Sequence, residues 1–245
     1  MHTALITGGS AGLGRALTAA LATRGWRVVV DARHADELRR VVAEIGRSCG
    51  SPHVVAVPGD VTDVAHRAEL AAVVGASGLD LLVHNASTLG PRGLRSLAEL
   101  GAADLRDVLA VNVVAPVALT AAVLPALRRA GGIIVTVSSD AAVEHYETWG
   151  GYGASKAALD HVAGTLAAEV PEVAAYAVDP GDMRTAMHQA AFPGEDISDR
   201  PLPETVLPAL LRLLDERPPS GRYRLADLAG PRDSAERGSA VEVPA

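Results

Sequence analysis

The sequence predicts an α/β fold, a doubly wound parallel sheet of about seven strands with helices on both faces, in a single domain. Three observations support this prediction. Short apolar, β-branched runs alternate with longer segments of helical spacing, which is the pattern of repeated strand–helix–strand units. Most of the runs are apolar throughout, as expected of strands covered on both faces. A glycine-rich turn lies between the first strand and the first helix, where such folds commonly bind ligands.

Six apolar runs and one shorter, more polar run near 222–226 are the predicted strands. The six are TALIT (3–7), RVVVD (27–31), HVVAV (53–57), DLLVH (80–84), GIIVTV (132–137) and VAAYAV (173–178). Because a helix follows each of the first strands, neighbouring strands should run parallel and be joined by right-handed crossovers. Polar residues that follow the strands should therefore gather at one edge of the sheet.

Segments of helical spacing separate the strands. We expect helices over 12–24, 35–47, 63–76, 102–130, 151–169 and near 203–216. Residues 180–204 are polar and interrupted by prolines, which indicates a loop with short helical pieces. We expect one domain over 1–229 and a flexible tail over 230–245, where Pro, Gly, Ser and charged residues are frequent.

Composition narrows the function classes. The 245 residues carry a net charge of −7 and contain no basic run, so nothing favours a nucleic acid or an anionic membrane as partner. The one cysteine, Cys49, permits no internal disulfide, and this agrees with a reducing, cytoplasmic location. The start MHTALITGG has no basic region and is predicted to be a strand, not a signal peptide. The eight histidines form no ligand-like pair, so we expect no metal site.

One segment, residues 108–127, is uncharged and long enough to span a bilayer. It contains Asn112, Thr120 and two prolines, and it is rich in alanine. A helix buried against a sheet and a second subunit explains this composition better than a membrane span does.

The first turn, in TALITGGSAGLGRAL, carries Gly8, Gly12 and Gly14 between a strand and a helix. Glycine permits a sharp turn and leaves room for a pyrophosphate, and the helix directs free N–H groups and its positive dipole end toward the phosphates. The spacing differs from the common G-x-G-x-x-G fingerprint, but the strand–turn–helix context favours a dinucleotide site.

The end of the second strand should lie near the adenosine ribose of such a cofactor. Asp31 is suited to accept a hydrogen bond from a ribose 2′-hydroxyl, which would select NAD. Arg33 is suited to pair with a 2′-phosphate, which would select NADP. The residues alone leave both cofactors open.

Tyr152 and Lys156, in YGASK, lie four residues apart and should share one face of a helix. A nearby ammonium should lower the pKa of the phenol from its ordinary value of about 10 and make it a usable acid or base. Tyr146 has no lysine at this spacing and lies in a predicted loop. We therefore expect Tyr152 to be the reactive tyrosine.

Polar residues follow several other strands. HNAS ends the fourth strand, Ser139 follows the fifth, DPGDMRT (179–185) follows the sixth, and Asn112 lies in the intervening helix. Open α/β sheets bind ligands at this edge. His145, Trp149, Met183, Met187 and Phe192 are further candidates for the wall or lid of a substrate pocket.

Over residues 3–228, these motifs and their order resemble the classical short-chain dehydrogenases/reductases, which have a Rossmann-type fold. The resemblance implies a catalytic tetrad of Asn112, Ser139, Tyr152 and Lys156, in which Asn112 anchors a water in a relay toward Lys156. It also implies a cofactor site of Gly8, Ser10, Gly12, Leu13, Gly14, Arg33, Asp60, Val61, Asn85, Ala86, Tyr152, Lys156, Pro180, Gly181 and Thr185.

The chain departs from the pattern of that family at three places. HNAS stands where the family mostly has N-N-A-G, so His84 and Ser87 are unusual. Asp179 stands in place of a common asparagine, and GRYRLADL (221–228) in place of an ending with D-G-G. Counted from Gly14, the position of the NAD-selecting acid falls on Ala32 and the basic position on Arg33, so the resemblance favours NADP(H) and leaves NAD(H) open.

The resemblance implies an NADP(H)-dependent oxidoreductase that interconverts a carbonyl compound and a secondary alcohol by hydride transfer, with Tyr152 as acid and base. A catalytically silent cofactor sensor or scaffold on the same fold is the alternative. An epimerase or dehydratase would need a larger carboxyl-terminal domain. We further expect a homodimer built on 102–130 and 151–169, with a tetramer left open by the altered end.

Overall fold

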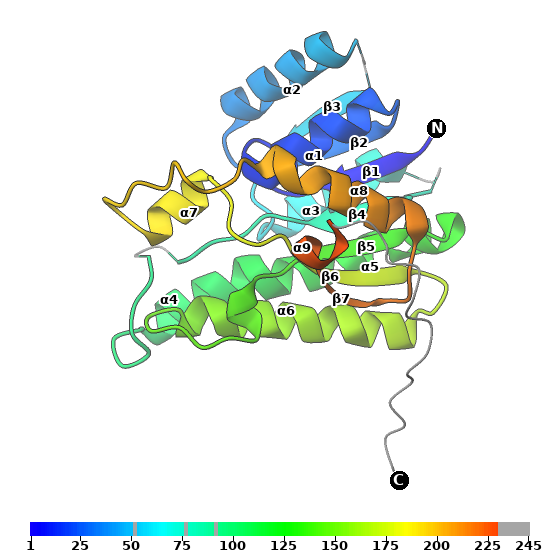
Figure 1. Cartoon of the computed structure of the whole chain (residues 1–245). Helices are drawn as coiled ribbons and strands as arrows, with labels where there is room; N and C mark the ends of the chain where they lie inside the picture. Colours follow the sequence, from blue (N-terminus) through cyan, green and yellow to red (C-terminus); the bar gives the residue numbers. More distant parts are fainter. Residues whose placement is uncertain (51–52, 76–77, 91–92, 230–245) are drawn as a thin grey trace, which may run out of the picture.

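The protein is described here from a computed structural model, which covers residues 1–50, 53–75, 78–90 and 93–229. Seven strands form one parallel sheet in the order β3-β2-β1-β4-β5-β6-β7 (Figure 1). The strands are β1 (Thr3–Ile6), β2 (Arg27–Ala32), β3 (Val54–Pro58), β4 (Leu81–His84), β5 (Ile133–Val137), β6 (Ala174–Asp179) and β7 (Gly221–Arg224). The predicted fold class is confirmed, and each predicted strand is present. The tail over 230–245 lies outside the described residues.

Helices connect the strands. They are α1 (Gly12–Thr23), α2 (Ala35–Cys49), α3 (Val64–Val74), α4 (Ala102–Leu109), α5 (Ala115–Ala130), α6 (Gly150–Glu169), α7 (Ala186–Ala191), α8 (Leu207–Glu216) and α9 (Leu225–Leu228). The predicted helix over 102–130 is interrupted by a π-helical segment, Ala110–Val114, which separates α4 from α5. The short helix α9 was not predicted, and it shortens the last strand to end at Arg224.

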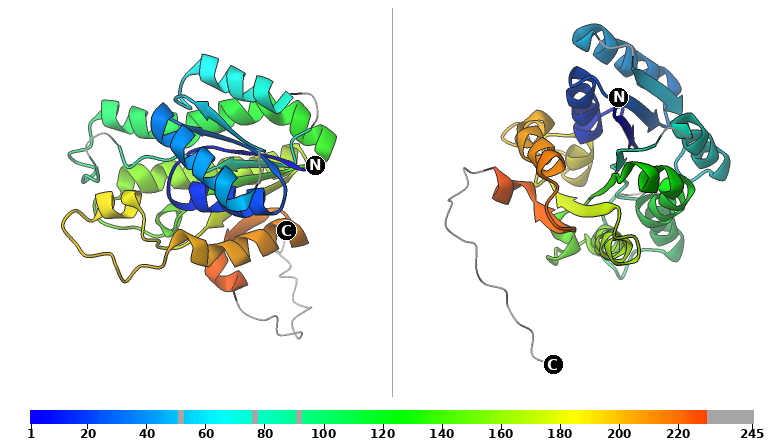
Figure 2. Two further views of the ribbon diagram at one scale, coloured as in Figure 1. Left: turned by 90° about the horizontal axis from the view of Figure 1, so that it is seen from above. Right: turned by 90° about the vertical axis from the view of Figure 1, so that its right-hand side faces the viewer.

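Helices cover both faces of the sheet, as Figures 1 and 2 show, and each face has its own hydrophobic core. On one face, Leu17 of α1 and Leu210 of α8 pack on strand residues such as Ile6. On the other face, Leu119 of α5 packs with α3 and with strand residues such as Leu5. Because successive strand residues point to opposite faces, the continuously apolar strands supply both layers.

The winding of the chain reverses beside β1. The chain passes outward from β1 to β2 and β3, then returns to β4 on the other side of β1 and continues to β7. The helices that follow β1 and β4 therefore diverge, and a crevice is expected at the carboxyl ends of these two strands. Figure 1 shows α7 and the start of α4 at this same end of the sheet.

The described residues contain one helix that is long and apolar enough to cross a membrane by length and composition, Ala102–Ala130. Within its most apolar window, 39% of the residues are buried inside the protein. Leu119, Val123 and Leu127 of this helix belong to the core beneath the sheet. Val114 and Val117 instead point outward, with 57% and 44% of their surfaces exposed. One face of this helix is thus apolar because it packs in the core, and another face carries exposed apolar side chains.

Candidate active site

A cavity of about 380 Å³ opens at the carboxyl edge of the sheet. Most of the predicted site residues line it, although they come from distant parts of the chain. They are Gly8, Ser10, Gly12, Leu13, Arg33, Asp60, Val61, Asn85, Ala86, Ser139, Tyr152, Lys156, Pro180, Gly181 and Thr185. Gly14 and Asn112 do not line it. The volume falls within the usual range of small-molecule sites.

The glycine turn between β1 and α1 has the backbone that a phosphate cradle requires. Gly8 and Gly12 adopt φ angles of +69° and +52°, a region that residues with a Cβ rarely occupy. A Cβ on Gly14 would lie 2.5 Å from the Gly8 carbonyl oxygen, so Gly14 permits close packing of helix on turn and does not face the cavity. The turn leaves the N-terminus of α1 open toward the cavity, and this arrangement suits a pyrophosphate.

Asn85 fixes the turn from the neighbouring strand. Its Nδ2 donates to the carbonyl oxygens of Thr7 and Gly8 at 2.9 and 3.0 Å. The Thr7 hydroxyl accepts from the backbone N–H groups of Asn85 and Ala86. The predicted strand-four motif therefore holds the glycine turn in place through hydrogen bonds within the protein.

Asp31 lies at the edge of the cavity, and its carboxylate is bonded to other parts of the protein. The residue is fully buried; one carboxylate oxygen accepts the Gly8 N–H at 2.8 Å, and the other lies 3.1 Å from Nε2 of His66 on α3. Burial raises the pKa of Asp31, although His66 and Gly8 oppose this shift. The hydrogen bond with Asp31 raises the pKa of His66. The His66 ring occupies the space beside Gly59, where a Cβ would lie 2.2 Å from Nδ1.

Arg33 is exposed and lines the same end of the cavity, next to Asp60. Asp60 accepts from the backbone N–H and the hydroxyl of Thr62 at 2.8 and 2.7 Å. Burial alone would raise the pKa of Asp60, but the bonds from Thr62 and the nearby Arg33 lower it overall. Arg33 is therefore an exposed cation at the cavity edge, close to Asp60.

Tyr152 and Lys156 lie on the face of α6 that turns toward the end of β5. Both are buried, and the Lys156 ammonium is 5.4 Å from the centre of the Tyr152 ring. Its Nζ donates to the carbonyl oxygen of Val137 at 2.7 Å. Tyr146, the other candidate, is half exposed and donates its hydroxyl to Asp140 at 2.9 Å. The structure brings Tyr152 and Lys156 together at the cavity and gives Tyr146 a carboxylate partner instead.

The expected lowering of the pKa of Tyr152 is not found. Burial raises the pKa of Tyr152 to about 12, and hydrogen bonding with Ser139 and Ser87 only partly opposes this shift. Burial also lowers the pKa of Lys156 to about 8. The reason for the difference is that desolvation penalises both charged forms, whereas the spacing argument considered only their attraction.

Ser87, in the loop after β4, and Ser139, just after β5, both interact with the Tyr152 phenol. The Ser139 hydroxyl donates to Asp140 at 2.9 Å and accepts from the backbone N–H of Ala141. Ser87 was noted in the sequence only as a departure from the family pattern. Its hydroxyl also donates to Asn112, so it belongs to the group of polar side chains around the phenol.

Asn112 lies in the π-helical segment, is 1% exposed, and uses its whole carboxamide within the protein. Its Oδ1 accepts from the Ser87 hydroxyl and the Thr88 N–H, and its Nδ2 donates to the Thr88 carbonyl and the Ser155 hydroxyl. The carboxamide thus has protein partners at both Oδ1 and Nδ2, and the water relay from Asn112 toward Lys156 stays a prediction. The side chain ties the loop after β4 to α6, and a π-helical turn is a frequent means of placing such a residue.

Two aromatic side chains, Trp149 and Tyr152, line the cavity, and Phe192 packs behind Trp149. Trp149 meets the Tyr152 ring edge-on at 5.6 Å, while Phe192 packs on Trp149 at 5.9 Å. Thr148, directly before Trp149, has a φ of +69°, which is rare for a β-branched residue and marks a strained backbone. Of the other sequence candidates, Met183 and Met187 line the cavity, and His145 is exposed outside it.

The loop after β6 closes the cavity opposite the glycine turn. Pro180, Gly181 and Thr185 line it, and a Cβ on Gly12 would lie 3.3 Å from the Thr185 methyl group. The Thr185 hydroxyl accepts from the His188 N–H at the start of α7. The predicted residues of this loop thus meet the first turn across the cavity.

His84 lies behind the site and is fully buried. Its Nε2 is 2.7 Å from the Thr120 hydroxyl on α5, and burial lowers the pKa of His84 to about 3. The imidazole is therefore neutral and structural. Within the described part of the chain, no three His, Cys, Asp or Glu side chains gather as metal ligands would.

Comparisons with known proteins agree on one family. The family model described as short chain dehydrogenase matches residues 2–196. A protein of Escherichia coli named uncharacterized oxidoreductase YciK is 32% identical over 86% of this chain and 85% of its own.

Solved structures are similar over nearly the whole chain. A short-chain dehydrogenase of Shigella flexneri, complexed with NADP, matches with a TM-score of 0.85 at 30% identity and covers 92% of this chain and 97% of its own. An alcohol dehydrogenase of Thermococcus sibiricus, complexed with 5-hydroxy-NADP, matches with a TM-score of 0.81 at 26% identity and covers 98% of this chain and 100% of its own.

The buried His84 predicts a specific pH dependence of stability. The pKa of His84 is about 3 in the folded protein and 6.5 ordinarily, so between pH 6.5 and pH 3 the unfolded chain binds a proton at this residue and the folded chain does not. Between these values, stability should fall by about 1.4 kcal/mol for each unit of pH decrease from this group alone. His84→Asn should make that slope shallower by about one proton. Urea unfolding at several pH values between 6.5 and 4 measures it, and His34→Asn, at an exposed histidine, is the control. Equal slopes in His84→Asn and the unmodified protein would contradict the assignment.

Proposed function

Because the chain belongs to the short-chain dehydrogenase family, we propose that it is an NADP(H)-dependent oxidoreductase that interconverts a ketone and a secondary alcohol. The observation that carries this proposal is the convergence of Tyr152, Lys156 and Ser139 at the cavity beside the glycine turn. The proposed proton donor, Tyr152, and the proposed dinucleotide-binding turn therefore line the same cavity. We assign catalytic roles to Tyr152, Lys156 and Ser139.

The chemistry follows from the protonation states. When bound, the nicotinamide supplies or accepts the hydride. Tyr152, with its pKa raised to about 12, is a neutral phenol near pH 7, and a phenol is a stronger acid than an alcohol. It is therefore in the correct form to donate a proton to the oxygen of a carbonyl that is being reduced. The Ser139 and Ser87 hydroxyls orient the phenol, and Lys156 presents a cation to its ring.

The preference for NADP(H) rests on Asp31 and Arg33. One carboxylate oxygen of Asp31 bonds Gly8 and the other bonds His66, so the side chain is already held by the glycine turn and by α3. Arg33 faces the same end of the cavity and can form a charge-assisted bond to a 2′-phosphate. The NADP complexes of the similar proteins agree with this assignment.

The aromatic wall suggests a substrate that carries a flat ring. The chain is only 3% aromatic, yet Tyr146, Trp149, Tyr152 and Phe192 gather on this side. Such rings favour stacked or edge-on contact with another ring. A screen of ketones with both cofactors, monitored by absorbance of the reduced nicotinamide, should find phenyl ketones better substrates than cyclohexyl ketones of equal size. No turnover of any ketone or alcohol would contradict the proposed activity.

We further propose a homodimer in the cytoplasm. Val114 and Val117 are exposed one helical turn apart, and Ala121 continues the strip along α5. A second copy of the same surface would cover it by two-fold symmetry. The altered end over 221–228 packs on β6 and α8 of the same chain. Whether it also forms the second contact that a tetramer needs is left open.

Tyr152→Phe should remove turnover while the chain still binds NADPH. Phenylalanine keeps the ring but cannot move a proton, so we expect kcat to fall by about 10²- to 10⁴-fold. The NADPH dissociation constant, measured by fluorescence titration, should change little. Tyr146→Phe is the control and should keep most of the activity. The opposite result for the two variants would identify Tyr146 as the reactive residue.

Arg33→Ala should weaken NADPH binding by about 10- to 100-fold, which is the value of a charge-assisted hydrogen bond of roughly 1.5–3 kcal/mol. NADH binding should change little because NADH lacks the 2′-phosphate. Titration of both cofactors tests this, with Arg39→Ala as control, because Arg39 is exposed on α2 and pairs with Asp36. A preference for NADH in the unmodified protein would assign the site to Asp31 instead.

Val117→Glu should convert the dimer to a monomer, because two buried carboxylates would face each other across the two-fold axis. Light scattering at micromolar concentration measures the mass of each variant. Val64→Glu, at an exposed valine of α3 that lies outside the strip, is the matched control. A monomeric unmodified protein would refute the interface. A tetramer would show that the end over 221–228 supports a second contact.

A further inference from the structure

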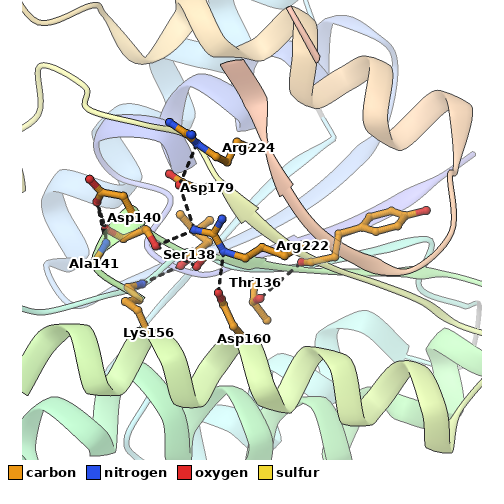
Figure 3. Close-up of polar contacts among 12 residues, drawn as sticks. Thr136, Ser138, Asp140, Ala141, Lys156, Asp160, Asp179, Arg222 and Arg224 are labelled. Atoms are coloured by element: carbon orange, nitrogen blue, oxygen red, sulfur yellow. Dashed lines mark hydrogen bonds and ion pairs between the residues drawn. The ribbon is translucent and has the colours of Figure 1, made fainter. Parts of the chain in front are cut away.

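The guanidinium of Arg222, in β7, lies between β5, β6 and α6, directly behind the proposed site (Figure 3). Its Nε contacts Asp160 at 3.1 Å. Its Nη2 donates to the Ser139 carbonyl oxygen at 3.0 Å and to Asp179 at 3.1 Å. Only 25% of the Arg222 side chain is exposed, so a cation with three acceptors is largely shielded from solvent.

Each of these three acceptors belongs to a segment that forms the cavity. Ser139 interacts with the Tyr152 phenol. Asp179 ends β6, and its second oxygen accepts the Gly181 N–H at 3.0 Å, which fixes the turn toward Pro180 and Thr185. Arg222 thus links the end of β5 to the loop after β6.

Asp160 provides the third link. It follows Lys156 by four residues, so Tyr152, Lys156 and Asp160 occupy one face of α6 at successive turns. The negative charge of Asp160 favours the charged form of Lys156, against the burial that disfavours it. Arg222 in turn holds Asp160 in place.

Arg222 and the carboxylates of Asp160 and Asp179 stabilise one another's charges. The side chains of Asp160 and Asp179 are only 15% and 4% exposed. A carboxylate at such depth is costly without a cation, and removal of one partner of a buried pair is far more damaging than loss of a surface pair. Arg224 also approaches Asp179, but at 3.9 Å and with 60% of its side chain exposed.

Two departures from the family pattern are therefore in contact with each other. Asp179 replaces a common asparagine, and Arg222 belongs to the segment GRYRLADL, which replaces the usual ending. The pairing explains why an acid is tolerated at the buried end of β6. It also gives the unusual ending a position next to the reactive groups.

We propose that Arg222 is a positioning residue for this site. It holds Ser139 through the Ser139 backbone carbonyl, the 180–185 turn through Asp179, and the face of α6 that carries Lys156 through Asp160. The proposal rests on the proposed function. Arg222 touches neither the substrate nor the cofactor in this role, and its effect reaches the chemistry through the three segments.

Arg222→Met is the primary test. It should lower kcat by about 10- to 100-fold, the size of effect that a displacement of about 1 Å at a site can have. It should also weaken NADPH binding through the 180–185 turn. Circular dichroism and thermal unfolding establish that the variant is folded at the assay temperature. Arg224→Met, on the same strand and beside the same carboxylate, is the matched control and should behave like the unmodified protein.

Rescue separates positioning from stability alone. In Arg222→Met/Asp179→Asn, the amide at position 179 still accepts from the Gly181 N–H and carries no charge that needs a cation, so NADPH affinity should recover most of its loss. Arg222→Lys keeps the charge but cannot reach three acceptors at once, so its kcat should be intermediate. This variant decides the question if Arg222→Met fails to fold.

Unchanged kcat and NADPH affinity in a folded Arg222→Met or Arg222→Lys, with only a lower melting temperature, would overturn the proposal. Losses in the double variant no smaller than in Arg222→Met would overturn the link through Asp179. These outcomes differ from a failure of the proposed function, because in that case the unmodified protein itself would not bind NADPH or reduce any ketone.

Discussion

The shared direction of the seven strands is the constraint on which the site depends. Every strand ends at the same edge, so residues that follow β1, β2, β4, β5 and β6 meet around one cavity although they are distant in sequence. The reversal of winding beside β1 separates the flanking helices and keeps this edge open. The apolar strands between the two helical layers then act as a rigid support for polar groups that would be mobile on loops alone.

Burial determines which partners the charged side chains at this edge of the sheet need. Lys156, Asp31 and Asp179 each carry or can carry a charge with almost no access to water, and each one therefore requires a fixed partner in the protein. Lys156 has the Val137 carbonyl, Asp31 has Gly8 and His66, and Asp179 has Gly181 and Arg222. The same bonds that satisfy these groups also determine the geometry of the turns, so the electrostatics and the shape of the site cannot vary independently.

Local patterns predicted the elements well, because strand period, helix period and glycine turns depend on nearby residues. They also predicted that Tyr152, and not Tyr146, lies beside Lys156, since spacing on a helix is a local property. The raised pKa of Tyr152 was not predictable in this way, because it depends on how completely the fold excludes water. The π-helical turn at Asn112 and the contacts of Arg222 were missed for a related reason. Both depend on residues from three or more separate segments, and the sequence marked Arg222 only by its unusual ending.

The packing of His66 against Gly59 has a consequence for how this chain can change over time. A side chain at position 59 would occupy the space of the imidazole, and loss of the imidazole would leave the buried Asp31 carboxylate without one of its two donors. Positions 31, 59 and 66 are thus expected to be inherited as a set. In related chains, substitution at one of these positions should therefore accompany substitution at the others, and this edge of the cavity should change in several positions at once.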